Sequence, residues 1–270
     1  MRVDAALVRR IEATAARQAT LLAASMRARS PESGADSTAH GSGAFISLGA
    51  GRYVNRAIGI GLEIGSGALS PAETLDALEL FSANHGVAAT LEVCPWTSSD
   101  FVAELASRGY RVEWFRNVFA RLPSPLPARL PSAFQFIEVT EETKTEWSVI
   151  LGEATAPASA ARRVNDEFCD AGHAVPGEQD LLATLDGRPV ACGSWNVIDG
   201  VGWLGAAATL SGARRRGAQR ALINERLRRI AGTEATLVVA TALPDGQSAR
   251  NLVDLGFSVL YTQAVMTRQP

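Results

Sequence analysis

The chain has 270 residues, of which 47% are hydrophobic and 20% charged, and a formal net charge of −2 at pH 7. This composition is ordinary for a folded globular protein, and the small net charge excludes a global attraction to nucleic acid or to anionic membranes. The odd number and wide spacing of Cys94, Cys169 and Cys192 exclude a disulfide framework. No apolar run approaches the roughly 20 residues that span a bilayer, so we expect a cytoplasmic protein without a membrane partner.

The first half of the chain begins with one long helix. Residues 3–29 contain neither glycine nor proline and carry apolar residues at helical spacing, which predicts an amphipathic helix. Residues 29–43 are polar, rich in turn formers and without periodicity, so they predict a loop with His40 in solvent. Short apolar pieces between residues 44 and 67 predict strands interrupted by glycine.

A second helix is predicted to begin at Ser70-Pro71-Ala72-Glu73. Serine can cap the helix, proline fits its first position, and the glutamate completes a capping box. This helix is expected to run to about Asn84. A strand over 87–93, a helix over 98–109 and a strand over 111–121 follow, which makes a compact α/β domain over residues 1–122.

The prolines of residues 123–132 remove backbone donors and favour extended conformations, so this segment predicts an interdomain linker. Residues 133–270 are expected to form a second domain in the order β-α-α-β-β-β-α-β-α-β. The Asp-Gly pairs at 186–187 and 199–200 separate three strand-like runs and are strong hairpin signals. The fold class is therefore α/β or α+β, with two domains.

The stretch of residues 206–222 combines a small-residue strand, a turn with three arginines and the start of a helix at Gly217-Ala218-Gln219. Backbone N–H groups in the first turn of a helix lack intrahelical partners, and the helix dipole places positive potential there. Glycine lets an anion approach the backbone without meeting a Cβ. The sequence therefore predicts an anion site, and a phosphate group suits it.

This stretch and its surroundings resemble the GCN5-related N-acetyltransferase (GNAT) superfamily. The phosphate loop of that family, (Gln or Arg)-x-x-Gly-x-(Gly or Ala), is matched by residues 214–219 at the arginine and the first glycine, with Gln219 as a departure. The order of elements and the Leu255-Gly256-Phe257 ending fit as well. The resemblance covers about residues 133–270 and implies a mixed sheet flanked by helices.

The resemblance implies acetyl-CoA as the cosubstrate, with its pyrophosphate on the loop amides and its pantetheine arm on the exposed edge of the fourth strand. Strand contacts would come from Ala207, Ala208 and Thr209, although core packing is the simpler explanation of such small side chains. Ser248 and Asn251 share a helix face and could also contact the cofactor, or serve only as cap or surface residues. The implied loop contacts are Arg214, Arg215, Arg216, Gly217, Ala218, Gln219 and Arg220.

The catalytic groups are less well defined by the sequence. Many members of the family carry a tyrosine as the proton donor where this chain has Leu252, so Tyr261 on the closing strand is the substitute candidate, with a packed aromatic as the alternative. Cys169 and His173 resemble half a zinc site, but no second pair stands nearby and no metal is expected. The candidates for the general base are Glu153, Asp166, Glu167, His173 and Asp180, and their spacing in the sequence does not distinguish among them.

The first half repeats part of the same plan, since Arg108-Gly109-Tyr110 ends its last helix where the second half has Leu255-Gly256-Phe257. It lacks a counterpart of the arginine and glycine loop, so we expect a degenerate GNAT-like copy, with an unrelated α/β domain as the alternative. The predicted function is an N-acetyltransferase that acts on an amine of a small molecule or a protein, and an oligomer is left open. A non-catalytic acyl-CoA sensor is the alternative from another class, and a nucleotide-dependent dehydrogenase is disfavoured by the absence of GxGxxG.

Overall fold

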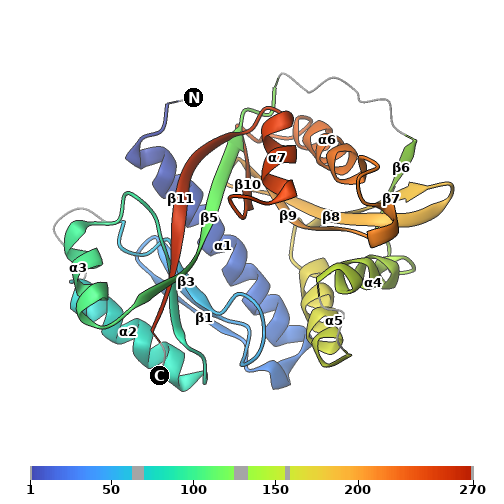
Figure 1. The fold of residues 1–270 in the computed structure, drawn as a ribbon. Helices are drawn as coiled ribbons and strands as arrows, with labels where there is room; N and C mark the ends of the chain where they lie inside the picture. The colour runs from blue at the N-terminus through green and yellow to red at the C-terminus, as the bar shows by residue number, and fades with distance from the viewer. Residues whose placement is uncertain (1, 63–69, 125–132, 156–158, 269–270) are drawn as a thin grey trace. The chain divides into compact units, whose positions relative to one another are not determined.

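The computed structural model describes residues 2–62, 70–124, 133–155 and 159–268 (Figure 1). The chain divides into two compact units, the first made of Met1–Asn117 with Tyr261–Pro270 and the second of Val118–Leu260. Strands β5 (Arg111–Arg121) and β11 (Ser258–Arg268) are therefore divided between the units. Most of the expected linker at 123–132 lies outside the described residues.

The end of the chain belongs to the first unit, whereas the sequence places it in the second domain. Ala264–Arg268 of β11 pair antiparallel with Val93–Ala89 of β4 (Ala89–Val93). Ladder hydrogen bonds and cross-strand side-chain pairs hold the last strand there. No local sequence pattern predicts this pairing between strands that are distant in the chain.

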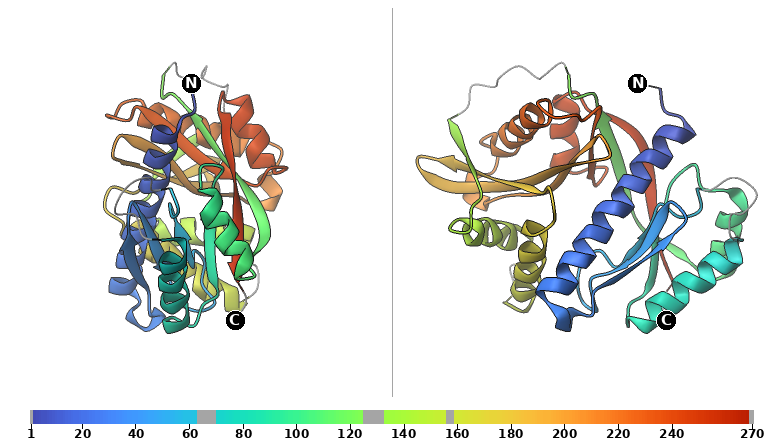
Figure 2. Two further views of the ribbon diagram at one scale, coloured as in Figure 1. Left: turned by 90° about the vertical axis from the view of Figure 1, so that its left-hand side faces the viewer. Right: turned by 180° about the vertical axis from the view of Figure 1, so that it is seen from behind.

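The first unit has the strand order β1-β2-β3-β4-β11-β5. Helix α1 packs on β1 to β3, while α2 and α3 pack together and α2 contacts β2 and β4 (Figure 2). Phe45, Leu75, Leu78, Leu91 and Leu105 are the centre of the core that α2 and α3 cover. The remaining elements are α1 (Ala5–Arg29), η1 (Pro31–Ser33), β1 (Asp36–His40), β2 (Gly43–Ser47), β3 (Arg56–Ile58), α2 (Pro71–Asn84) and α3 (Ser99–Ser107).

The loop expected at residues 29–43 is wrong in its second half, which forms strand β1. This strand pairs with β2 from Asp36↔Ser47 to His40↔Gly43 and makes a hairpin. His40 is partly buried rather than solvated, because its ring stacks on Phe45 at 4.8 Å and its Nε2 lies 3.1 Å from Thr74 Oγ1. Pairing with the fully buried β2 overrides the weak strand preference of this polar sequence.

The capping box at the start of α2 is confirmed. The Glu73 N–H donates to Ser70 Oγ at 3.2 Å, and the Ser70 N–H donates to Glu73 Oε2 at 3.0 Å. The Ser70 and Glu73 side chains therefore accept hydrogen bonds from backbone N–H groups at the start of α2, and the Glu73 carboxylate lies beside these N–H groups.

A buried polar cluster joins α1 to the sheet of the first unit. The Glu12 carboxylate is 2% exposed and accepts hydrogen bonds from Tyr261 Oη at 2.6 Å and Gln263 Nε2 at 2.8 Å. Glu92 is equally buried and pairs with Arg116 Nη2 at 2.5 Å and Arg56 Nε at 2.7 Å. Burial, and next the negative charge of Glu92, raise the pKa of Glu12 to about 7.

We expect Glu12→Gln to flatten the pH dependence of stability. The folded protein holds this proton more tightly than the unfolded chain does. The carboxyl group therefore stabilises the protein fully below its ordinary pKa of 4.5, and this contribution is lost as the pH rises through about 7. Between pH 4.5 and pH 8, denaturant unfolding should show a loss of stability that is larger in the wild type than in the variant by on the order of 2 kcal/mol. The exposed Glu32→Gln is the control, and an equal slope in Glu12→Gln and wild type would contradict the assignment.

Residues 133–270 follow the predicted order of elements, although most of the last strand belongs to the first unit. The parts of β11 and β5 that belong to the second unit are followed in the sheet by β10, β9, β8, β7 and β6. Helix α4 packs on β8 and β9 from one face and contacts α5, while α6 packs on the same strands from the other face (Figures 1 and 2). The elements are β6 (Phe134–Glu138), α4 (Lys144–Thr155), α5 (Ser159–His173), β7 (Gln179–Leu185), β8 (Arg188–Ile198), β9 (Val201–Thr209), η2 (Ser211–Ala213), α6 (Ala218–Ile230), β10 (Leu237–Ala242) and α7 (Gln247–Asp254).

Both Asp-Gly hairpin turns are confirmed. Asp186 and Asp199 have a φ of 51°, and the glycines that follow have φ values of 75° and 70°. Two successive left-handed residues are the signature of a type I′ turn, which matches the twist of the flanking strands. The apolar stripe of α6, with Leu222, Ile223, Leu227 and Ile230, packs into the core of this unit. Within the described ranges, no helix is long and apolar enough to cross a membrane.

Candidate functional site

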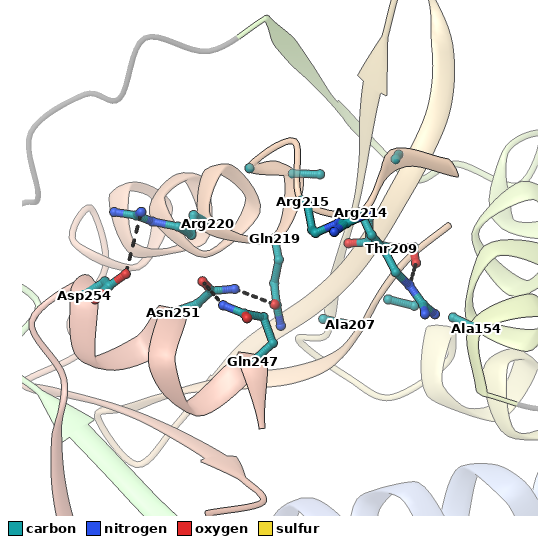
Figure 3. A pocket seen from close by; sticks show the side chains of 14 residues that line it. Ala154, Ala207, Thr209, Arg214, Arg215, Gln219, Arg220, Gln247, Asn251 and Asp254 are labelled. Atoms are coloured by element: carbon teal, nitrogen blue, oxygen red, sulfur yellow. Dashed lines mark hydrogen bonds and ion pairs between the residues drawn. The ribbon is translucent and has the colours of Figure 1, made fainter. Parts of the chain in front are cut away.

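A cleft of about 710 Å³ opens where β9 ends and α6 begins (Figure 3). All the residues that the sequence predicts as cofactor contacts line this cleft except Arg216 and Ser248. Four lining residues are absent from that prediction: Ala154 of α4, Ala213, and Gln247 and Asp254 of α7. Gln247, Asn251 and Asp254 have i, i+4, i+7 spacing and therefore share one helix face. This shared face was the signal that could have added Gln247 and Asp254 to the predicted Asn251.

Strand β9 has one edge that is only partly paired. Its parallel register with β10 joins Val201–Trp203 to Leu237–Val239, whereas its antiparallel pairing with β8 continues to Thr209. Ala207 and Thr209 therefore lie beyond the part of β9 that pairs with β10, and they line the cleft. Backbone groups at an unpaired strand edge are available to an extended ligand.

The turn between β9 and α6 presents the start of the helix to the cleft. Arg215 and Gly217 have φ values of 62° and 89°, which make the tight turn. The Ala221 N–H donates to Gly217 O at 3.0 Å, and Gly217 makes no side-chain cap. The preceding N–H groups of the first helical turn therefore remain for another acceptor. A Cβ built on Gly217 would find no described protein atom within 4 Å, so the space over the helix start is open.

The cleft is basic on one side. Arg214 and Arg215 are exposed, and Arg214 Nε donates to Thr209 O at 3.3 Å. Arg220 Nη1 lies 3.6 Å from Asp254 Oδ2, and both side chains are substantially exposed, so this ion pair is weak. Guanidinium groups beside a helix start are well suited to a phosphate.

Gln219, the departure from the family motif, has a structural role. Its Nε2 donates to Ser248 Oγ at 2.6 Å, and its Oε1 accepts from Asn251 Nδ2 at 2.6 Å. Gln247 Nε2 in turn donates to Asn251 Oδ1 at 3.1 Å (Figure 3). The amide side chain thus ties the start of α6 to α7, and it engages both residues that the sequence assigned to the cofactor on that helix.

A bulge in β9 lies next to the cleft. Gly193 of β8 pairs with Ala207 and Trp195 pairs with Leu204, so Gly205 and Ala206 face Ser194 alone. The buried Arg226 of α6 donates from Nη1 to Ser194 O at 2.9 Å. A classical ladder bond is missing at a bulge, and this guanidinium supplies a donor instead. Burial lowers the pKa of Arg226 to about 10.

The structure separates the five candidate bases. Glu153 and Asp166 are exposed, and Glu167 Oε1 pairs with Arg163 at 3.2 Å. His173 Nδ1 and Asp180 Oδ2 lie 2.7 Å apart, and both side chains are largely buried. Only this pair is brought together, because the end of α5 lies over the start of β7.

A further carboxylate beside that pair was missed from the sequence. Glu178 is partly buried and accepts a hydrogen bond from Asn196 Nδ2 at 2.8 Å. Burial, and next the charge of Asp180, raise its pKa to about 7, while hydrogen bonds from Ser194 and Asn196 oppose the shift. Glu178 and Asp180 alternate at the start of a strand, so a shared face was the signal that could have found them.

Tyr261 is not among the residues that line the cleft, and it belongs to the first unit. It is 5% exposed and its hydroxyl proton is engaged by Glu12, while burial, followed by the Glu12 charge, raises its pKa. A proton donor must contact the reacting group, so we do not assign that role to Tyr261. Leu252 is 3% exposed and packs in the core of the second unit.

The cysteines are free and buried, and burial raises the pKa of the Cys169 thiol to about 12. Such a thiol is a poor metal ligand and a poor nucleophile at neutral pH. Among the described residues, no three His, Cys, Asp or Glu side chains are grouped so that they could hold a metal ion.

Comparison with known proteins finds similarity in the sequence of the second unit and in the fold of most of the chain. A model of the acetyltransferase (GNAT) family matches residues 138–257. A GCN5-related N-acetyltransferase from Kribbella flavida aligns at 19% identity with a TM-score of 0.63, covering 93% of this chain and 96% of that one. A tandem GNAT protein from the clavulanic acid biosynthesis pathway aligns at 16% identity and a TM-score of 0.61 over 84% and 79% of the chains. No curated protein sequence matches significantly.

Proposed function

Since residues 138–257 form a GNAT acetyltransferase domain, we propose that the second unit transfers an acetyl group from acetyl-CoA directly to an amine. The observation that carries this proposal is the uncapped start of α6, which opens into the same cleft as the unpaired edge of β9. The acceptor is an amine of a small molecule or a protein. The buried, reduced cysteines suit a cytoplasmic location.

The residues of the cleft fit the parts of this donor. The N–H groups before Ala221, with Arg214, Arg215 and Arg220, would bind its phosphates. Ala207 and Thr209 would bind the amides of the pantetheine arm through their backbone, because β10 does not cover their edge. Bound there, acetyl-CoA supplies an activated acyl group.

The chain must also handle protons. A neutral amine is the nucleophile, so a base has to remove the proton of an ammonium acceptor. The leaving sulfur needs a proton or a hydrogen-bond donor, and neither Leu252 nor Tyr261 is placed to provide one at the cleft. We therefore propose direct transfer without a covalent enzyme intermediate, in which the second proton of the amine leaves with the sulfur.

We also propose that the first unit is a degenerate copy that does not bind acetyl-CoA. Helices α3 and α7 end in the same way: Tyr110 N–H donates to Leu105 O and Phe257 N–H donates to Leu252 O, each at 3.1 Å, after a left-handed glycine. The copies differ at the preceding helix start. The Glu73 carboxylate caps α2, which disfavours a phosphate, whereas α6 starts with an uncapped glycine.

An acyl-CoA sensor without turnover is the second candidate function. The specific observation for it is the core position of Leu252, which removes the proton donor that the family resemblance implies. Binding would then be retained while chemistry is lost. The two functions predict the same affinity and differ only in turnover.

Calorimetric titration of the wild type with acetyl-CoA is the first test, and we expect saturable binding. Release of the CoA thiol should then be followed with spermidine, tyramine, glucosamine and a lysine-containing peptide as acceptors. Turnover with one of these amines supports the transferase. Tight binding with no turnover on the whole panel supports the sensor, and the absence of acetyl-CoA binding contradicts both.

A further inference from the structure

A cluster of polar side chains surrounds Glu178 on the face of the sheet that packs against α4 and α5. Asp180 of β7 pairs with Ser194 of β8, and the Asn196 side chain donates to the Glu178 carboxylate. His173 lies close enough to influence the charge of Glu178, and its Nδ1 is held by Asp180. Three elements, α5, β7 and β8, thus converge on one carboxylate.

This cluster adjoins the bulge of β9. A Cβ built on Gly205 would lie 3.3 Å from Glu178 Oε1 and 2.2 Å from Ser194 Oγ. A residue with a side chain would therefore clash at position 205, because these polar groups occupy the space that its Cβ would need. Ala207, which lines the cleft, is two residues further along the strand, or about 7 Å at the usual rise.

Two buried polar atoms of the cluster have no hydrogen-bond partner in the described chain: Asn196 Oδ1 and His173 Nε2. Asn196 is 1% exposed. When Nδ1–H of His173 donates to Asp180, Nε2 is an acceptor, and a carboxamide oxygen is always one. The Asn196 amide and the Ser194 hydroxyl donate to the Glu178 carboxylate, but no described group donates to these two acceptor atoms.

We propose that Glu178 is the general base of the second unit, and that Glu178, Asn196 and His173 bind the ammonium group of the acceptor. An ammonium group carries three N–H donors and no acceptor, which complements this cluster. The proposal rests on the acyl transfer proposed above and adds a class of acceptor, a protonated primary amine. Asp180 is a positioning residue, because it acts by orienting His173.

The proton and bond changes balance. Glu178 takes one proton from the ammonium nitrogen and leaves a neutral amine. This nitrogen bonds to the acyl carbon while the bond between that carbon and sulfur breaks, and a second N–H proton leaves with the sulfur. Glu178 then releases its proton to water. A base whose pKa is about 7 is half ionised at neutral pH and suits this task.

Glu178→Gln is expected to lower turnover at least about 100-fold while the Kd for acetyl-CoA stays that of the wild type. The probes are acetyl-CoA and the amine that gives the highest rate on the panel above. The wild-type rate should fall below pH 7, and the variant should lose this dependence. Glu234→Gln, at an exposed carboxylate of the same unit, is the matched control and should keep both the rate and the pH profile.

A second test does not depend on turnover: NMR of protein labelled with 13C-glutamate follows the titration of each glutamate carboxyl group. The wild type should show two groups that titrate near pH 7, Glu12 and Glu178, and Glu178→Gln should remove one of them. If Glu178→Gln does not fold, Glu178→Asp replaces it, and a reduced rate with a retained pH profile supports the base.

Three results would overturn the inference: an unchanged rate and profile in either variant, acetyl-CoA binding without turnover on any amine, or a wild type in which only one glutamate titrates near pH 7. Failure of the proposed function is distinguishable, because then the wild type does not bind acetyl-CoA at all.

Discussion

Gly217→Val should abolish saturable binding of acetyl-CoA, with a loss of affinity of at least about 100-fold, or 2.7 kcal/mol. The valine side chain would enter the open space above the first turn of α6, where no described protein atom lies within 4 Å. It would cover the backbone N–H groups of this first turn, which have no intrahelical acceptor and are expected to bind the phosphates. Isothermal calorimetry of wild type and variant gives the comparison directly.

Backbone strain needs its own control, because Gly217 has a φ of 89° and a β-branched residue there is costly. Gly187 is matched: its φ is 75°, a Cβ on it would meet nothing within 4 Å, and it is not among the residues that line the cleft. Gly187→Val should lose a similar amount of stability and bind acetyl-CoA as the wild type does. Equal affinity for acetyl-CoA in Gly217→Val and wild type would contradict a phosphate site at the start of α6.

Arg226→Ala should destabilise the protein by about 3 kcal/mol, which is the largest stability effect we expect. The side chain is 2% exposed, and its guanidinium donates to Ser194 O at the bulge and to Leu222 O. Truncation would leave a buried carbonyl without its donor and a cavity beside Gly193, where the Arg226 Cζ lies 3.2 Å from the position of a Cβ. Denaturant unfolding monitored by circular dichroism measures this loss.

Arg228→Ala on the same helix is the matched control, because its side chain is 46% exposed and it should change stability by less than about 0.5 kcal/mol. The bulge positions Gly205 and Ala207, so Arg226→Ala should also weaken acetyl-CoA binding in conditions where it remains folded. A variant as stable as the wild type would show that the bulge does not depend on this donor.

The second unit was predicted well because its signals are local. The Asp-Gly turns, the stripe of α6 and the Gly256 stop each depend on residues within one or two turns of each other. The arginine and glycine loop was found for the same reason, since a strand, a turn and a helix start are contiguous in the chain. Strand β1 was missed because its partner β2, rather than its own polar sequence, makes it a strand.

The surroundings of the candidate site residues depend on contacts that are distant in sequence. Tyr261 looked available beside Phe257, but its hydroxyl is bound to Glu12, which lies 249 positions away. Gln219 was unexplained until Ser248 and Asn251 appeared beside it. Glu178 had no motif around it, and only the register of β7, β8 and the bulged β9 placed it against Gly205.

The sequence by itself determined the order of elements in the second unit and the helix start that suits an anion, because backbone propensity and hydrophobic periodicity act over a few residues. Tertiary structure alone decided that the last strand joins the first unit, that Arg226 completes the bulge, and which carboxylates are desolvated. Burial and charge proximity arise only when distant segments pack together, and these two quantities set the protonation of Glu12 and Glu178.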